Sequence, residues 1–294
     1  MGPPFTGGHP YLNGLQSILD LFLSWHARRV DDLQDQDKLQ RMAVPKSRWI
    51  ILALSLCVIP VLSAFAEEPK VSAVLELFTS QGCASCPPAD ELLEDFAKRD
   101  DIVALSLPVD YWDYLGWKDT LASHEFTDRQ KSYANARGDR QIYTPQVIVN
   151  GTTHVVGSDR AAIEAALKTK PPLAVPIRMS MAGDAIQVSI GETADKAIPR
   201  VRKATIWLAL YKRHIDVPIR KGENQDRTLS YYNVVTKLRP IAMWKGTPVS
   251  VDLPMSEYHQ ANADGCAILL QAETPNGEPG EILGAAFSEK GAEW

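Results

Sequence analysis

Cysteine is scarce in this chain, and its scarcity limits the metal chemistry that the sequence can support. The 294 residues contain four cysteines, and none of the six histidines stands at ligand spacing from a cysteine or another histidine. A tetrahedral zinc site needs about four ligands. A lone Cys-x-x-Cys pair could form half of such a site, but the sequence argues against zinc, and we expect no metal.

An excess of positive charge is also missing. The chain has 31 Lys and Arg against 36 Asp and Glu, which gives a formal net charge of −5. A nucleic-acid-binding surface normally needs a basic patch, so this balance argues against a nucleic-acid partner. Residues 172–294 contain no recognisable catalytic triad, phosphate loop or metal-ligand cluster. We expect no cofactor.

Long apolar runs are scarce as well, and the run near the N-terminus predicts an export signal. Residues 42–66 begin with a segment that carries Lys46 and Arg48, continue with an apolar run and end in Ala-Phe-Ala. A basic segment, an apolar segment and an Ala-x-Ala site form a secretory signal peptide, here cut after Ala66. We expect the mature protein, from Glu67 onward, to be periplasmic or secreted and to make no membrane contact.

Residues 1–41 show no pattern of a folded domain, and a signal peptide normally begins at the initiator methionine. We therefore interpret Met42 as the true start and residues 1–41 as a leader outside the fold. The alternative for the apolar run is an uncleaved anchor helix. The 18 residues from Trp49 to Ala66 are interrupted by Pro60, and a spanning helix needs about 20 residues, so we favour the signal peptide.

Two cysteines separated by two residues, Cys83 and Cys86, follow a strand-like apolar run and a turn signal. A helical pattern begins directly after them, with Pro87 and Pro88 in its first turn. A Cys-x-x-Cys pair at the start of a helix is typical of a dithiol redox site. Unpaired N–H groups at a helix N-terminus stabilise a thiolate and can lower a cysteine pKa from about 8.5 to roughly 3.5–7.5. We predict Cys83 as the exposed nucleophile and Cys86 as the resolving thiol.

The same pair could instead form a structural disulfide without chemistry, because disulfides form readily in exported proteins. Pairing of Cys83 with Cys86 would leave Cys266 single in the mature chain. Cys266 lies in an apolar run that predicts a buried strand, where a free cysteine behaves as a small hydrophobe. A role for Cys266 as a further resolving thiol is the alternative.

Beyond the cysteines the pattern continues in the order of a known fold. It predicts a strand at 102–107, a helix from Ser123 to Arg137 stopped by Gly138, a hairpin around Asn150-Gly151 and a helix capped by Ser158-Asp159. This order resembles the thioredoxin-like superfamily. The resemblance implies that Thr144 and Pro145 form a cis-proline turn facing the dithiol, where a substrate cysteine would dock.

The resemblance has one departure. Thioredoxin-like proteins bury an acid in the strand before the dithiol as a proton acceptor. The matching position is Leu77, whereas Glu76 points to the opposite face because side chains alternate along a strand. We therefore expect the usual proton acceptor to be missing. Asp110 and Asp113 are the nearest substitutes, if their loop folds over the site.

Two longer stretches are similar to a more specific family. The residues from Leu75 to Asp90 and from Val109 to Trp117 resemble a group of secreted bacterial proteins and relatives known only as domain of unknown function 1223. The resemblance runs from about Val71 to the C-terminus. It implies a thioredoxin-like domain and supplies no activity.

The segment Tyr111–Trp117 is dense in aromatic residues. In one interpretation they pack in the core or at its rim, because Trp and Tyr carry large apolar areas. In the other, Tyr111, Trp112 and Trp117 form a substrate-binding wall beside the dithiol, since loops often carry function.

Three prolines, Pro171, Pro172 and Pro176, mark a linker, and the pattern then changes to short alternating runs. Strands are expected at 177–181, 185–190, 205–211, 248–253, 266–271 and 282–287. Repeated strands with almost no helical signal predict an antiparallel β-sandwich. The expected fold class is an α/β thioredoxin-like domain over residues 67–171 followed by an all-β, sandwich-like domain over residues 172–294.

The polar segment 219–235 interrupts these strands. It is typical of a solvated hairpin loop. The alternative is a functional patch in which Arg220, Glu223, Asn224 and Arg227 face the dithiol domain or a partner.

Together these observations predict an exported thiol–disulfide oxidoreductase that acts on cysteine-containing exported proteins through Cys83 and Cys86, with Thr144 and Pro145 beside them. Two alternatives stay open. One is a non-enzymatic binding module with a structural disulfide. The other is a Cu(I)-binding dithiol protein, for which His154 is the nearest candidate for a further ligand.

Overall fold

Two stretches of the chain carry the architecture, because the computed structural model describes residues 71–193 and 203–288. The expected leader (1–41) and signal peptide (42–66) lie outside them. No helix within these two stretches has the length and apolar character that crossing a membrane requires.

The described elements alternate between strands and helices at first and are mostly strands afterwards. The first half contains β1 (Ala73–Thr79), α2 (Pro87–Ala97), β2 (Ile102–Pro108), the 3-10 helix η2 (Asp113–Leu115), α3 (His124–Arg137), β3 (Gln146–Val149), β4 (Thr153–Val156) and α4 (Arg160–Thr169). The second half contains β5 (Ile177–Met181), β6 (Ala185–Ile190), β7 (Ala204–Pro218), β8 (Thr228–Trp244), β9 (Val249–Pro254), α5 (Met255–Gln260), β10 (Gly265–Glu273) and β11 (Pro279–Phe287).

Local signals set the elements of the first half as the sequence predicts. The Ser123 hydroxyl accepts a backbone N–H at the start of α3, and Gly138 ends that helix with a φ of 78°. Asp159 caps α4 in the same way. Asn150 and Gly151 both have positive φ, 48° and 73°, and join β3 to β4, which is the conformation that favours Asn-Gly in tight hairpins.

Strand β1 lies inside the sheet and separates two helical layers. It pairs in parallel with β2 and antiparallel with β3. Leu75 and Leu77 pack in a cluster with residues of α2 and α4. Phe78 packs in a second cluster with residues of α3, and Glu76 pairs with Arg129 of α3. Side chains one apart therefore face opposite layers, as strand geometry requires.

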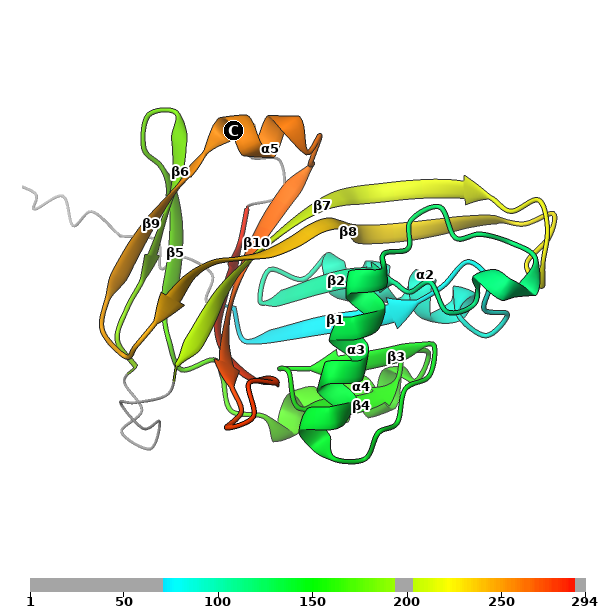
Figure 1. Ribbon diagram of the computed structural model, residues 1–294, viewed down its shortest axis with the longest axis horizontal. Coiled ribbons are helices and arrows are strands. Elements are labelled where there is room, and N and C mark those ends of the chain that lie inside the picture. The colour runs from blue at the N-terminus through cyan, green and yellow to red at the C-terminus, as the bar shows by residue number, and fades with distance from the viewer. Residues whose placement is uncertain (1–70, 194–202, 289–294) are drawn as a thin grey trace, which may run out of the picture. The chain divides into compact units, whose positions relative to one another are not determined.

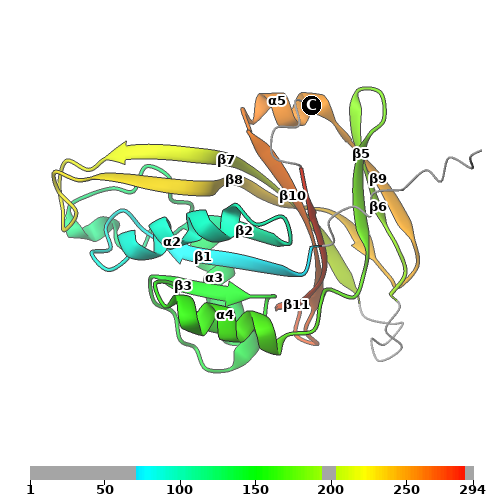
Figure 2. The same cartoon turned by 180° about the vertical axis from the view of Figure 1, so that it is seen from behind.

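The sheet does not end at β2. Strand β8 pairs with β2 in parallel through Ser106 and Val234, and the strand order is β11-β10-β7-β8-β2-β1-β3-β4. Figures 1 and 2 show the long β7–β8 hairpin running beside β1 and β2 in both views. Strands β5, β6 and β9 form a separate antiparallel sheet.

The expected fold class, an α/β thioredoxin-like domain followed by an all-β sandwich-like domain, is therefore wrong. One mixed sheet takes strands from both halves of the chain. One core cluster joins Phe78 and Phe126 of the first half to Tyr211 and Leu269 of the second. An open edge at β2 would expose unpaired N–H and C=O groups, and β8 covers that edge. The division into folding units at residue 171 stays a prediction.

Strand β8 is the element that the sequence analysis missed. The strands expected at 177–181, 185–190, 205–211, 248–253, 266–271 and 282–287 are present as β5, β6, β7, β9, β10 and β11. The start of β8 was instead assigned to the polar segment 219–235. Its residues alternate irregularly between buried and exposed, and Pro240 interrupts the apolar pattern, so the strand signal is weak.

A buried polar network ties the two halves together beneath β1. Glu76, 1% exposed, accepts a hydrogen bond from Arg129 Nε at 2.6 Å and another from the hydroxyl of Tyr133. Arg129 also donates to Gln271 Oε1 on β10 at 3.0 Å. Burial alone would lower the pKa of Arg129, but its interactions with Glu76 and Tyr133 together outweigh burial and raise the pKa. Arg129 therefore keeps its positive charge and is held by partners from β1, α3 and β10.

Replacing Arg129→Met should lower the free energy of unfolding by about 3–5 kcal/mol, because it leaves the Glu76 carboxylate buried without its cation. The matched control is Arg99→Met, whose ion pair with Asp101 is half-exposed and should contribute about 0–1 kcal/mol. Urea denaturation measures both. Equal losses in the two variants would contradict a structural role for the buried pair.

Candidate functional site

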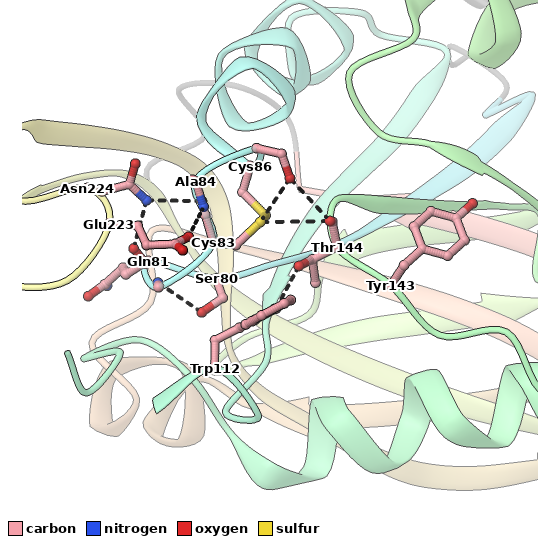
Figure 3. The surroundings of a disulfide bond; sticks show 12 residues. Ser80, Gln81, Cys83, Ala84, Cys86, Trp112, Tyr143, Thr144, Glu223 and Asn224 are labelled. Carbon is pink, nitrogen blue, oxygen red and sulfur yellow. Dashed lines mark hydrogen bonds between the residues drawn. A yellow bond between two sulfur atoms is a disulfide. The ribbon is translucent and has the colours of Figure 1, made fainter. Parts of the chain in front are cut away.

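The two cysteines of the Cys-x-x-Cys pair are joined in a disulfide between β1 and α2. Cys83 and Cys86 have their Cα atoms 5.4 Å apart, and Cys86 is the N-cap of α2. Pro87 and Pro88 occupy the first two helical positions, where they cost little because first-turn N–H groups have no helical partner. Figure 3 shows the surroundings of this disulfide.

Both cysteines are buried in the disulfide form. Cys83 is 3% exposed and Cys86 is fully buried, whereas the two residues between them, Ala84 and Ser85, are exposed. The expectation of an exposed Cys83 is therefore wrong, because Cys83 is packed in the turn before α2. The roles of Cys83 as the outer nucleophile and Cys86 as the resolving thiol stay a prediction.

The predicted Thr144-Pro145 turn lies against the outer sulfur. Its peptide bond is cis, as the resemblance implied. The Thr144 carbonyl oxygen lies 3.8 Å from Cys83 Sγ and 3.5 Å from the hydroxyl of Ser85, and that hydroxyl lies 3.4 Å from Cys83 Sγ. Pro145 is buried beneath Gly157, where a Cβ would lie 3.1 Å from the proline ring.

The structure brings one of the three predicted aromatic residues to the dithiol. Trp112 donates from Nε1 to Thr144 Oγ1 at 2.7 Å. It also lies close to Gly82: a Cβ atom added to Gly82 would be 3.1 Å from the Cβ atom of Trp112. Tyr111 lies next to Trp112, with ring centroids 5.8 Å apart, and burial raises its pKa to about 12. Tyr114, 77% exposed, stacks on Trp112 at 6.4 Å.

Trp117 has a different environment. Its Nε1 donates to Gln81 Oε1 at 2.8 Å, and its ring packs against a small cluster formed by residues of β7, β8 and the loop between them. The indole N–H of Trp117 therefore binds the turn before Cys83, and its ring packs on the β7–β8 hairpin. Of the predicted wall, Trp112 and its neighbour Tyr111 lie on the side of Thr144, whereas Tyr114, which stacks on Trp112, was not predicted.

A contact from the second half of the chain completes the site. We call residues 219–227, between β7 and β8, the tip loop. Asn224, 1% exposed, donates to the carbonyl oxygens of Gln81 at 2.9 Å and Cys83 at 3.0 Å. Glu223 Oε2 accepts from the N–H of Ala84 at 3.3 Å. The alternative that this polar segment faces the dithiol is thus confirmed for Glu223 and Asn224.

The other two residues of that predicted patch lie further out. Arg227 donates to Asn224 Oδ1 at 3.0 Å, which fixes the orientation of the amide so that its N–H groups point at the two carbonyls. Arg220 is exposed on the same loop.

A buried carboxyl beside Cys86 was missed by sequence reasoning. Asp90 lies one helical turn after Cys86, its N–H donates to the Cys86 carbonyl at 3.1 Å, and its side chain is 2% exposed. Within the described residues neither carboxyl oxygen has a hydrogen-bond partner of good geometry. Burial raises the pKa of Asp90 well above its usual value, and the nearby Thr79 hydroxyl lowers it only in part. The i, i+4 spacing from Cys86 was the signal that could have found it.

The acids proposed as substitutes are engaged elsewhere. Asp110 accepts from Thr127 Oγ1 at 2.6 Å and faces His124 at 2.8 Å. Asp113 accepts the backbone N–H of Asp119 at 3.0 Å. Their partners are thus residues of α3 and its preceding loop, and Asp90 is the acid nearest to the two cysteines along the chain.

Metal-ligand clusters and cavities do not offer a competing site. Among residues 71–193 and 203–288 there is no group of three or more His, Cys, Asp or Glu that could hold a metal ion. His154 is bound to the hydroxyl of Tyr143 at 2.9 Å. A cavity of about 150 Å³ lies between α2, β2 and the β7–β8 hairpin, lined among others by Glu94, Lys98 and Tyr232, and contains none of the predicted site residues.

Comparisons with known proteins relate the chain to a family and to solved structures. The family model described as a protein of unknown function (DUF1223) matches residues 74–271. A crystal structure of a protein from Agrobacterium tumefaciens is 40% identical, with a TM-score of 0.67, and the match covers 76% of this chain and 98% of that one. HBP35 of Porphyromonas gingivalis is 11% identical, with a TM-score of 0.50, over 76% and 78% of the two chains; this likeness concerns the fold alone. No curated protein matches.

The raised pKa of Asp90 predicts how stability changes with pH. The folded protein holds this proton more tightly than the unfolded chain, so the free energy of unfolding should fall as pH rises from about 4 through the folded pKa, and then level off. Asp90→Asn should remove this part of the slope. Urea unfolding between pH 3.5 and 7.5 measures it.

The control for this experiment is Glu125→Gln, which removes an exposed carboxylate of α3 that is not among the groups acting on Asp90 and should leave this part of the slope unchanged. An Asp90→Asn variant with the slope of the original protein would show that Asp90 is not the buried titrating group.

Proposed function

The chain belongs to the DUF1223 family, and we propose that it is a thiol–disulfide exchange protein whose reacting pair is Cys83 and Cys86. The family description gives no activity, so the proposal rests on the site. The observation that carries it is the set of groups on the outer sulfur: the Thr144 carbonyl and the Ser85 hydroxyl both lie within 3.8 Å of Cys83 Sγ. A disulfide that only joined two backbone segments would not need such neighbours.

The first step of the exchange uses Cys83. In the reduced protein its thiolate attacks one sulfur of a substrate disulfide, a bond forms between Cys83 and that sulfur, and the other substrate sulfur leaves as a thiolate. The exposed Ser85 hydroxyl is placed to donate to the Cys83 thiolate. The substrate backbone would lie along Thr144, with Trp112 and Tyr114 as an aromatic surface beside it.

The second step uses Cys86. Its thiol loses a proton and attacks Cys83 Sγ. The Cys83–Cys86 bond forms, the bond between Cys83 and the substrate sulfur breaks, and that sulfur leaves as a thiolate. The substrate gains two electrons and the protein loses them. Because Cys86 is fully buried, water cannot take its proton directly, and we assign Asp90, one helical turn away, as the acceptor. Run backwards, the same steps oxidise a substrate dithiol.

The substrates expected from this site are exported proteins that contain cysteines. This expectation joins the exchange chemistry to the signal peptide predicted at residues 42–66, because disulfides form and persist outside the cytosol. An aromatic surface beside the reacting sulfur suits an extended peptide without demanding one sequence.

A second candidate function is favoured by the low exposure of the sulfurs. Cys83 at 3% and Cys86 at 0% are what a structural disulfide would show. In that case the disulfide would only fix the N-terminus of α2, and the protein would act as a binding module through another surface. The experiment below separates the two candidates.

Cys83→Ala should abolish insulin reduction, because no outer nucleophile remains. Cys86→Ala should form a mixed disulfide with substrate that persists, since the resolving thiol is missing. Cys266→Ala is the matched control: this buried cysteine, whose pKa is raised to about 12 by burial, should be dispensable. Activity of Cys83→Ala equal to that of the control would rule out the exchange mechanism and favour the structural disulfide.

A further inference from the structure

The tip loop makes a contact with the dithiol that the exchange mechanism does not use. The Glu223 carboxylate accepts the N–H of Ala84, the residue directly after Cys83. Figure 3 shows Glu223 and Asn224 reaching this backbone. Asn224, 141 positions away from Cys83 along the chain, anchors the loop through two buried hydrogen bonds. The Glu223 carboxylate is thereby held on the N–H of the residue that follows Cys83.

Backbone donors for a thiolate are already few at this site. Pro87 and Pro88 have no N–H, although they occupy the helix positions whose donors would face the sulfur. The N–H groups of Ala89 and Asp90 both donate to the Cys86 carbonyl. The Ala84 N–H is therefore a valuable donor, and its partner is an anion.

Two physical effects of Glu223 act in the same direction. The carboxylate competes with a Cys83 thiolate for the N–H of Ala84, and its negative charge disfavours a second negative charge nearby. Both effects destabilise the reduced, thiolate form of the pair relative to the disulfide. A less stable thiolate makes a dithiol pair a better reductant, whereas a stabilised thiolate makes the disulfide a stronger oxidant.

We propose that Glu223 is a positioning residue that sets the redox equilibrium of the pair, holding it toward the reducing side through the docked tip loop. This inference rests on the proposed thiol–disulfide exchange and deepens it, because it assigns the direction in which the pair works best: it reduces substrate disulfides rather than introducing them. The reference reaction is protein dithiol plus oxidised glutathione giving protein disulfide plus two reduced glutathiones, which balances atoms and electrons.

The test is the equilibrium constant of this reaction for the original protein, Glu223→Gln and Asp226→Asn. Glu223→Gln keeps the shape and removes the charge, and the constant for disulfide formation should fall about three- to tenfold. Asp226 is a second, exposed carboxylate of the tip loop that binds Gln225. Asn tolerates its positive φ of 64°, so the control should leave the constant unchanged.

Two further measurements test whether Glu223 acts through its charge and whether this requires the docked tip loop. Because Glu223 is exposed, the difference between the original protein and Glu223→Gln should shrink in 1 M salt, where the Debye length is about 3 Å. In an Asn224→Ala background, which frees the tip loop, Glu223→Gln should have little further effect. The proposal would be overturned by a full effect of Glu223→Gln in the Asn224→Ala background. It would also be overturned if the difference in equilibrium constant between the original protein and Glu223→Gln did not change with salt.

Failure of this inference differs from failure of the proposed function. If the original protein reduces insulin but Glu223→Gln does not change the equilibrium constant, the inference is wrong and the function stands. If the constant shifts as expected but no variant reduces insulin, Glu223 sets the equilibrium and the exchange function is wrong.

Discussion

The pairing of β8 with β2 is the contact on which the rest of the structure depends. Ser106 and Val234 form its register pair, and Asn233, in a left-handed conformation with a φ of 46°, donates its side-chain N–H to the Ala104 carbonyl at 2.9 Å. Because β7 pairs along β8 and β10 along β7, this seam brings the strands of the second half into the sheet of the first. One core cluster then contains residues of both halves.

The seam also builds the site. It aligns the β7–β8 hairpin with β1, so that the tip loop lies at the same end of the sheet as the turn between β1 and α2, as Figures 1 and 2 show; this turn carries the dithiol. Asn224 can then bind the turn before α2. The same hairpin places Tyr231 of β8 near Asp90: burial, and after it the Asp90 carboxyl, raise the pKa of Tyr231, which is 1% exposed. A dithiol with its own helix alone would have neither contact.

The sequence predicts what local chemistry decides. The caps of α3 and α4, the Asn150-Gly151 hairpin and the cysteines at the start of α2 follow from side chains that act on their own backbone. The seam, the tip-loop contact and the shared core cluster join residues more than a hundred positions apart, and β8, whose burial pattern is irregular, carries no sequence pattern that predicts its partner strand. Asp90 lay between these cases, since its spacing from Cys86 was visible but its burial was not.

Thiol–disulfide exchange requires the Cys83–Cys86 bond to be reversible, and the most direct test is the reduction potential of this bond. The protein is equilibrated against glutathione buffers, and the fraction of disulfide is read after alkylation of free thiols. If the pair exchanges, its potential should lie between about −270 and −120 mV, the range of dithiol pairs that exchange. A potential below about −300 mV, typical of structural disulfides, would contradict exchange.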